Sequence, residues 1–176
     1  MKEEYKVDVE WRPFYLYFDT PPEGRDLPEY IKQKRAMGSE DRLRQIAALQ
    51  GMEFKSTERI YNTRLAHEAT EFARERGKAN EFHKIVFRNV YAEGKDPSQW
   101  DMLRFAAEEV GLSADEMQAD VESGKYKGKV EEQVRWAYQI GVTGVPTYVI
   151  NDRYAIVGAQ PYEVFRNALE QILGRA

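Results

Sequence analysis

Cysteine is absent from the 176 residues of this chain, and this absence excludes more chemistry than any other feature of the composition. Without a thiol there is no disulfide, no thiolate nucleophile, no iron–sulfur cluster and no cysteine-type zinc site. Histidine is also scarce, and the two present cannot form a three-histidine metal site. We therefore expect no metal and no cofactor, so any catalysis would rest on carboxylates, hydroxyls, lysine, arginine or backbone dipoles.

Long apolar runs and an excess of basic charge are lacking as well. No stretch approaches the 18 apolar residues of a membrane span, and the N-terminus carries no apolar segment of a signal peptide. The net charge of −4 argues against nucleic-acid binding, which uses basic surfaces. We expect a soluble, cytoplasmic protein that binds neither nucleic acid nor membrane.

What the chain does contain is enough apolar material for a core. Hydrophobic residues make up 42% and aromatic residues 12%, which is typical of a folded globule. The length fits one domain, or one domain that carries an insertion.

The predicted elements run in the order strand, several helices, hairpin, helix. Residues Lys6–Arg12 alternate polar and apolar side chains, which predicts a half-buried strand that ends at Pro13. From about residue 21 to residue 140 almost every segment is typical of helix. Residues 147–150 and 153–157 then form a predicted hairpin around Asn151-Asp152, and Pro161 opens a final helix.

Helix ends and faces are marked within the long helical region. Capping patterns predict helix starts at Asp96–Gln99, with Pro97 as the first helical residue, and at Ser113–Glu116. Gly77, Gly111 and Gly141 follow the predicted last turns of three helices. Residues 82–90 are apolar on nearly every side, which indicates a helix buried within a bundle.

Neither histidine stands in an obvious catalytic arrangement. His67 falls on a polar helix face, where it is either a surface side chain or an acid–base group. His83 lies on the apolar segment and is interpreted as a core histidine. The adjacent carboxylate pairs are expected on solvent faces or in first helical turns, where acids favour the helix dipole.

The segment Gly141–Thr147 carries the most information. A helix ends, a short turn follows, and Pro146 stands at the first position of a strand, where proline is tolerated. A cis Val145–Pro146 bond would leave the backbone of Val145 able to pair with an extended ligand. Because only about 5–6% of X–Pro bonds are cis, position alone predicts no more than a strand-initiating proline.

Four blocks in the same order give the chain a recognisable resemblance. They are residues 141–150, residues 158–160 with the final helix, residues 9–14, and residues 62–67. Together they resemble the DsbA family of thioredoxin-fold disulfide oxidoreductases, in particular its FrnE-like branch, which is related to the 2-hydroxychromene-2-carboxylate isomerases.

The resemblance implies an α/β, thioredoxin-like fold with a large helical insertion. Residues 1–20 and 140–176 would form the thioredoxin-like part, and residues 21–139 the insertion. It also implies that Pro146 is cis and that an extended peptide or thiol substrate pairs with the loop of Thr143, Gly144, Val145 and Pro146. Asn62 and His67 are the further candidates for the active-site face.

The chain departs from the family pattern where the family's chemistry resides. The family begins with a strand and a Cys-x-x-Cys helix that precede the strand matched by Val7–Trp11, whereas Met1 stands just before that second strand. We therefore expect a domain without its catalytic unit and with an open sheet edge. The edge would be filled by Val7–Trp11 shifting against Thr147–Ile150, by strands swapped between copies in a homo-oligomer, or by another polypeptide.

Three functions follow from this departure. The first is an oxidoreductase-family domain that is inactive as a dithiol catalyst in its cysteine-free form. The second is a non-catalytic peptide-binding or assembly module. The third is a glutathione-linked isomerase, with Asn62 and His67 near its site.

Overall fold

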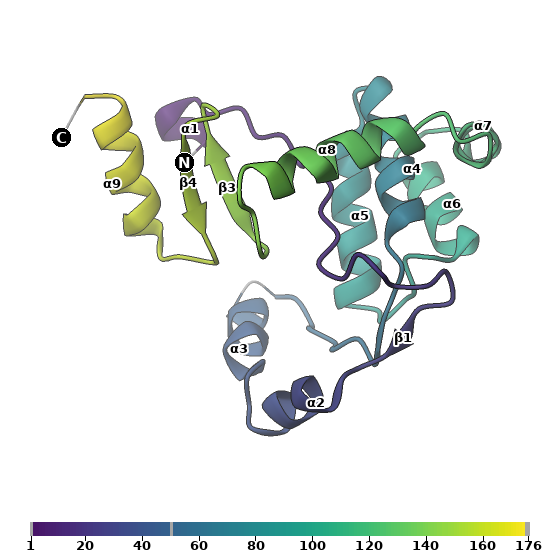
Figure 1. Cartoon of the computed structure of the whole chain (residues 1–176), viewed down its shortest axis with the longest axis horizontal. Helices are drawn as coiled ribbons and strands as arrows, with labels where there is room; N and C mark the ends of the chain where they lie inside the picture. The colour runs from purple at the N-terminus through teal and green to yellow at the C-terminus, as the bar shows by residue number, and fades with distance from the viewer. Residues whose placement is uncertain (1, 50, 175–176) are drawn as a thin grey trace. The chain divides into compact units, whose positions relative to one another are not determined.

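The computed structural model describes residues 2–49 and 51–174, which form short strands and mostly short helices (Figure 1). Met1, on which the expected missing strand depends, lies outside the described residues. In chain order the elements are α1 (Lys2–Tyr5), β1 (Arg25–Asp26), α2 (Glu29–Ala36), α3 (Asp41–Leu49), β2 (Arg59–Ile60), α4 (Arg64–Glu75), α5 (Ala79–Tyr91), α6 (Trp100–Glu109), α7 (Ala114–Glu122), α8 (Lys127–Gln139), β3 (Thr147–Ile150), β4 (Tyr154–Val157) and α9 (Tyr162–Ile172).

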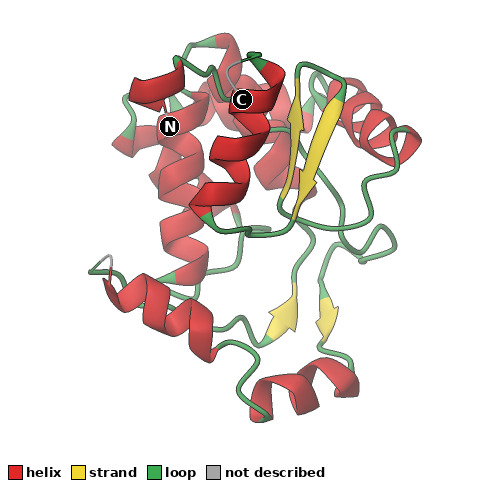
Figure 2. Ribbon diagram, turned by 90° about the vertical axis from the view of Figure 1, so that its left-hand side faces the viewer, coloured by secondary structure: helices red, strands yellow, loops and turns green. Residues whose placement is uncertain are grey.

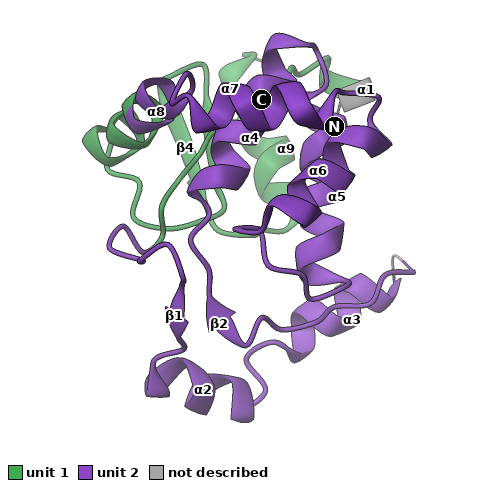
Figure 3. Cartoon of the chain, turned by 90° about the vertical axis from the view of Figure 1, so that its right-hand side faces the viewer, with its two compact units in different colours: residues 1–16, 132–176 green, residues 17–131 purple. Residues whose placement is uncertain are grey.

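The chain divides into two compact units (Figure 3). One unit consists of residues 1–16 and 132–176, and the other of residues 17–131, so that α8 begins in one and ends in the other. The domain boundaries that the resemblance implies, after residues 20 and 139, remain a prediction.

The main hydrophobic core lies among the helices α4, α5, α6 and α7, which Figure 2 draws in red. Phe72, Phe82, Leu103 and Met117 are fully buried there, and alanines lie between them on α4 and α6. Burying a side chain of this size contributes about 1.5–3 kcal/mol, so this cluster dominates the stability of the unit.

Several predicted helix ends are confirmed. Gly77, Gly111 and Gly141 follow α4, α6 and α8, with φ angles of 70°, 74° and 83°. Glycine is favoured at such positions because it has no Cβ to clash in the left-handed region. Ser113 caps α7, since its Oγ accepts a hydrogen bond from the N–H of Glu116 at 3.2 Å.

The helix start predicted at Asp96–Gln99 is wrong. Here the Oδ1 of Asp96 accepts hydrogen bonds from the N–H and the Oγ of Ser98, at 2.8 and 2.7 Å, and this closes a turn. Helix α6 begins only at Trp100, and Gln99 precedes it without a capping side-chain bond. The acid therefore caps a turn before the helix, because Asp side chains bond the backbone two residues on as readily as a helix end.

The prediction for residues 82–90 is correct on one face only. Phe82, Val86, Asn89 and Val90 are buried against the bundle, whereas Phe87 is exposed. Apolar character around a helix does not distinguish a fully buried helix from one that leaves an aromatic side chain in solvent.

The strand predicted at residues 7–11 does not form. The segment has no regular secondary structure, and Val9 and Trp11 are exposed. An alternating sequence becomes a strand only when a neighbour completes its ladder of hydrogen bonds. Among the described residues, β3 pairs with β4 alone and β1 with β2 alone. Pairing of Val7–Trp11 with Thr147–Ile150, one of the three ways in which the open edge could be filled, is therefore absent within the chain.

The predicted hairpin is confirmed, but β4 begins at Tyr154 and not at residue 153, so three residues connect the strands where two were predicted. Strands β3 and β4 are antiparallel, with Ile150 opposite Tyr154, and the N–H of Arg153 donates to the carbonyl of Ile150 at 3.2 Å. Asn151 and Asp152 have φ angles of 51° and 53°, the left-handed conformation that a tight hairpin turn requires.

Helix α9 covers one face of this hairpin. The ring of Phe165 lies edge-on against Tyr148, with centroids 4.7 Å apart. Helix α1 is tied to the same helix, because the Tyr5 hydroxyl donates to Glu170 at 3.2 Å. The hairpin and both helices belong to one unit.

Across residues 2–49 and 51–174, no helix combines the length and the hydropathy that crossing a lipid bilayer would require.

Candidate functional site

The loop between α8 and β3 holds the predicted substrate-binding residues. Helix α8 ends at Gln139, and the N–H of Val142 closes its last turn by donating to the carbonyl of Ala137 at 2.9 Å. Thr143, Val145 and Pro146 are exposed, and Gly144 is half-buried. Most residues of the loop are therefore exposed to solvent.

Hydrogen bonds hold this loop on both of its sides. The Thr147 hydroxyl donates to the carbonyl of Gly144 at 2.8 Å, and the N–H of Gly158 donates to the carbonyl of Pro146 at 2.8 Å. The Val145–Pro146 peptide bond is cis. The residues on either side of Val145 are thus fixed by contacts within the hairpin unit.

The backbone N–H and carbonyl of Val145 are available for hydrogen bonding to a ligand. The residue is 57% exposed, and no hydrogen bond from any described residue reaches its N–H or its carbonyl. It stands two residues before β3, whose second edge has no strand partner among the described residues. A donor and an acceptor in this position can extend a ladder to an added chain, which is the geometry of β-strand addition.

Asn62 has a structural role that uses both ends of its amide. Its Oδ1 accepts from the N–H of Arg64 at 3.0 Å, and its Nδ2 donates to the carbonyl of Thr20 at 2.8 Å. The first bond supports the start of α4, and the second ties the loop of residues 17–24 to that helix. The side chain is therefore a positioning residue within its unit.

His67 lies in the first turn of α4 and is half-buried. Its backbone N–H donates to the carbonyl of Thr63 at 3.1 Å. Asn62 and His67 belong to the unit of residues 17–131, whereas Thr143–Pro146 belong to the other unit. The sharing of one site by these two groups stays a prediction.

His83 lies on α5 against Phe87, with ring centroids 4.2 Å apart. Burial, together with the positive charge of Arg74, lowers the pKa of His83 to about 4. The ring is consequently neutral at neutral pH. The lowered pKa agrees with the interpretation of His83 as a histidine within the bundle.

Two buried carboxylates on α4 escaped the sequence analysis. Glu71 is bonded to Arg74 at 3.1 Å and contacts Lys129 at 2.8 Å, and Glu68 lies 4.0 Å from Arg64. Burial raises the pKa of Glu68, an effect that the charge of Arg64 partly opposes. The sequence did hold a signal for these ion pairs, because Arg74 stands three residues after Glu71 and Arg64 four residues before Glu68 on the same helix.

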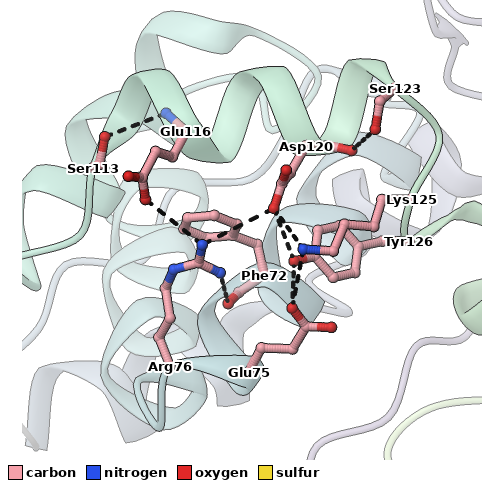
Figure 4. A network of polar contacts seen from close by, with 9 residues as sticks. All are labelled: Phe72, Glu75, Arg76, Ser113, Glu116, Asp120, Ser123, Lys125 and Tyr126. Atoms are coloured by element: carbon pink, nitrogen blue, oxygen red, sulfur yellow. Dashed lines mark hydrogen bonds and ion pairs between the residues drawn. The ribbon is translucent and has the colours of Figure 1, made fainter.

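A network of polar contacts links α4, α7 and the residues that follow each of them (Figure 4). The guanidinium of Arg76 lies 3.4 Å from the ring centroid of Phe72, and the ammonium of Lys125 bonds Asp120 at 2.7 Å. Hydrogen bonds of the Lys125 ammonium within the cluster raise its pKa, and the bond to Asp120 has the largest effect. The Tyr126 hydroxyl donates to Glu75 at 2.7 Å. Each of these groups therefore has an interaction partner within the cluster.

No group of three or more histidine, aspartate or glutamate side chains suited to a metal ion occurs in the described part of the chain. The loop at Val145 is accordingly the site whose arrangement suggests binding.

Comparison with known proteins shows the family and the fold of the chain. Residues 1–170 match the family of DSBA-like thioredoxin domains. The protein YwbO of Bacillus subtilis (strain 168) is 31% identical over 166 residues, which cover 93% of this chain and 81% of YwbO. A 2-hydroxychromene-2-carboxylate isomerase of Sphingobium xenophagum is 33% identical over 85 residues, covering 48% of this chain and 44% of the isomerase.

Among solved structures, a probable DsbA oxidoreductase from Streptomyces coelicolor superposes with a TM-score of 0.73 and 31% identity. The match covers 82% of this chain and 63% of the Streptomyces chain, so this protein spans less than two thirds of that relative. The DsbA-like thioredoxin fold and the likeness to oxidoreductases and isomerases that the sequence suggests are thereby confirmed. With a family match along nearly its whole length and a relative 31% identical over most of its residues, the chain belongs to the family of DSBA-like thioredoxin domains.

Proposed function

We propose that this chain is a cysteine-free, peptide-binding member of its family. The proposed ligand is an extended polypeptide segment, and the proposed site is the backbone of Val145. The observation that carries the proposal is that Val145 is an exposed residue whose N–H donates, and whose carbonyl accepts, no hydrogen bond among the described residues. Neither group has a hydrogen-bond partner among the described residues, and both lie on a loop fixed at Gly144 and Pro146.

Binding here requires no thiol chemistry. The sequence contains no cysteine, so this polypeptide cannot supply a sulfur atom to a mixed disulfide. We expect the purified protein to leave the rate of insulin reduction by dithiothreitol at the value of buffer alone. A measurable acceleration would show a redox activity that the proposal does not contain.

Backbone pairing predicts weak and sequence-tolerant binding. An extended segment that donates to the Val145 carbonyl and accepts from its N–H gains two hydrogen bonds, each worth about 0.5–1.5 kcal/mol net. Few side-chain contacts are fixed in this mode, because the main chain provides the affinity. The ligand is therefore defined by an extended, unpaired backbone.

The test measures fluorescence anisotropy with a short labelled peptide of alternating serine and valine. Val145→Pro removes the amide donor, whereas Val145→Ala keeps the backbone and serves as the matched control. Losing one bond corresponds to an affinity about two- to tenfold lower for the proline variant. The alanine variant is expected to bind like the wild type, and thermal unfolding followed by circular dichroism checks that both variants fold.

A second ligand keeps the test independent of the proline variant. The same peptide, N-methylated along its backbone, has no donors and is expected to lose binding to the wild-type protein. Equal binding of the methylated and unmethylated peptides would refute backbone pairing at this loop.

A second candidate function is assembly through the open edge of β3. Residues 7–11 keep the alternation of a strand without pairing as one, and β3 has one unpaired edge among the described residues. A second copy could supply Val7–Trp11 to this edge in a strand-swapped homo-oligomer. Val9→Pro, which removes a ladder donor from the exchanged segment, is then expected to abolish self-association.

The glutathione-linked isomerase gains less support. Its predicted site includes Asn62, whose amide oxygen and nitrogen are both bonded within the protein. Titration calorimetry with glutathione tests this alternative, and we expect no heat of binding.

A further inference from the structure

Strand β3 pairs with β4 along one edge, and no strand among the described residues lies along its other edge. The register of the pair places Tyr148 opposite Ile156 and Ile150 opposite Tyr154. In an antiparallel pair, hydrogen-bonded and non-hydrogen-bonded residue pairs alternate along the strands. Each residue of β3 therefore directs its N–H and carbonyl either toward β4 or toward the unpaired edge.

A hydrogen bond just beyond the two strands shows which residues face which way. The N–H of Gly158 donates to the carbonyl of Pro146 at 2.8 Å, so Pro146 directs its carbonyl toward the β4 side. Two residues later, Tyr148 also faces β4, because hydrogen-bonded pairs recur at every second residue. The N–H and carbonyl groups of Thr147 and Val149 consequently point to the unpaired edge.

These outward groups form one row with those of Val145. No hydrogen bond among the described residues reaches the N–H or the carbonyl of Thr147 or Val149, and the same holds for Val145. Along a strand, groups that face one side recur about every 7 Å. Another extended backbone presents its own donors and acceptors at the same interval, so it is complementary to this row.

We propose that the ligand of the Val145 site is an extended segment of at least five residues, which continues along the unpaired edge of β3 and pairs with Thr147 and Val149. This inference rests on the proposed function, because it takes Val145 as the first point of contact. It adds the length and the register of the ligand. The ladder ends after Val149, since Asn151 has a φ angle of 51° and starts the hairpin turn.

The two faces of the hairpin determine how the ligand's side chains are arranged. The ring of Tyr148 lies against Phe165, with centroids 4.7 Å apart, so α9 covers that face. Thr147 and its partner Val157 lie on the other face, where Val157 is 60% exposed. A β-branched side chain on the ligand would extend this row and gain cross-strand contacts. The proposed ligand therefore carries β-branched residues at every second position, and a slip by one residue would turn them to the face of α9.

The first test uses wild-type protein and two forms of the peptide of alternating serine and valine. One form is N-methylated at every valine, and the other at every serine. Only every second amide of a paired strand points to its neighbour. Fluorescence anisotropy is therefore expected to show that one form binds like the unmethylated peptide and that the other does not bind. Equal binding of the two forms would overturn the proposed register.

The second test changes the far end of the row. Val149→Pro removes a donor that faces the unpaired edge, where proline is tolerated, and Val149→Ala is the matched control. Losing one hydrogen bond is expected to make the affinity of the proline variant for the peptide about two- to tenfold lower than that of the alanine variant. Circular dichroism checks that both variants fold. Equal affinities of the two folded variants would overturn pairing at Val149.

Amide hydrogen exchange followed by NMR separates a failure of this inference from a failure of the proposed function. Bound peptide is expected to protect the N–H groups of Val145, Thr147 and Val149, whereas those of Tyr148 and Ile150, which face β4, should change little. Protection of Val145 alone would overturn the extension along β3 and leave the proposed function standing. Binding that protects none of the three outward amides would overturn both.

The same measurement on the free protein distinguishes a peptide from a second copy of the chain. The amides of Thr147 and Val149 are expected to exchange rapidly at every protein concentration, because they have no partner among the described residues. Protection that grows with protein concentration would assign the edge to a second copy and overturn the peptide as its occupant.

Discussion

Replacing His83 by glutamine should flatten the dependence of stability on pH. Burial, with a smaller contribution from the charge of Arg74, lowers the pKa of His83 to about 4 in the folded protein. In the unfolded chain a histidine titrates near 6.5. Between these two values the unfolded state binds more protons than the folded state, so stability falls as the pH falls.

The size of this effect follows from the two pKa values. The stabilisation is complete above about pH 6.5 and is lost as the pH approaches 4, to a limit of about 3 kcal/mol. His83 is half-buried, and solvent screening of the partly exposed ring reduces the expected loss to about 1–2 kcal/mol.

The assay is urea unfolding at several pH values between about 5 and 7. This range lies above the titration of Glu75 and Asp120, whose pKa values are lowered by their hydrogen bonds to Tyr126 and Lys125. We expect the free energy of unfolding to fall as the pH falls in the wild type, and to fall less steeply in His83→Gln. An equal slope in the two proteins would refute the assignment.

Two further predictions concern the stability of the unit of residues 17–131. Asn62→Ala should destabilise the protein by about 1–3 kcal/mol, because it removes two hydrogen bonds, and thermal unfolding would measure the loss. Gly24→Ala should cost more than Gly111→Ala, since both glycines have positive φ but a Cβ at Gly24 would meet the Ile60 carbonyl oxygen at 2.7 Å and one at Gly111 would meet nothing within 4 Å. Equal losses of stability in the two glycine variants would contradict the steric argument.

Local signals in the sequence predicted local structure well. The hairpin turn at Asn151-Asp152, the cap at Ser113 and the glycines after α4, α6 and α8 depend on a few neighbouring residues, and the structure confirms them. The strand at residues 7–11 failed because pairing depends on a partner far away in the chain, which no alternation of side chains can guarantee.

The candidate site was predictable only in part. The segment Thr143–Pro146 stood out in the sequence, but the absence of hydrogen-bond partners for Val145 among the described residues required the structure. Asn62 was singled out by resemblance, but its side chain bonds the backbone of Thr20 and Arg64 and so stabilises the start of α4. The exposure of Leu43, Ile46 and Leu49 on α3 was not predicted, because apolar side chains on a helix more often face a core.

The central claim, that Val145 pairs with an extended chain, is tested most directly by amide hydrogen exchange followed by NMR. The N–H of Val145 has no partner among the described residues, so it should exchange rapidly in the free protein. With saturating serine–valine peptide, the account predicts that this amide becomes strongly protected, and that the N-methylated peptide leaves it unchanged. Binding of the unmodified peptide without protection of the Val145 amide would contradict the account.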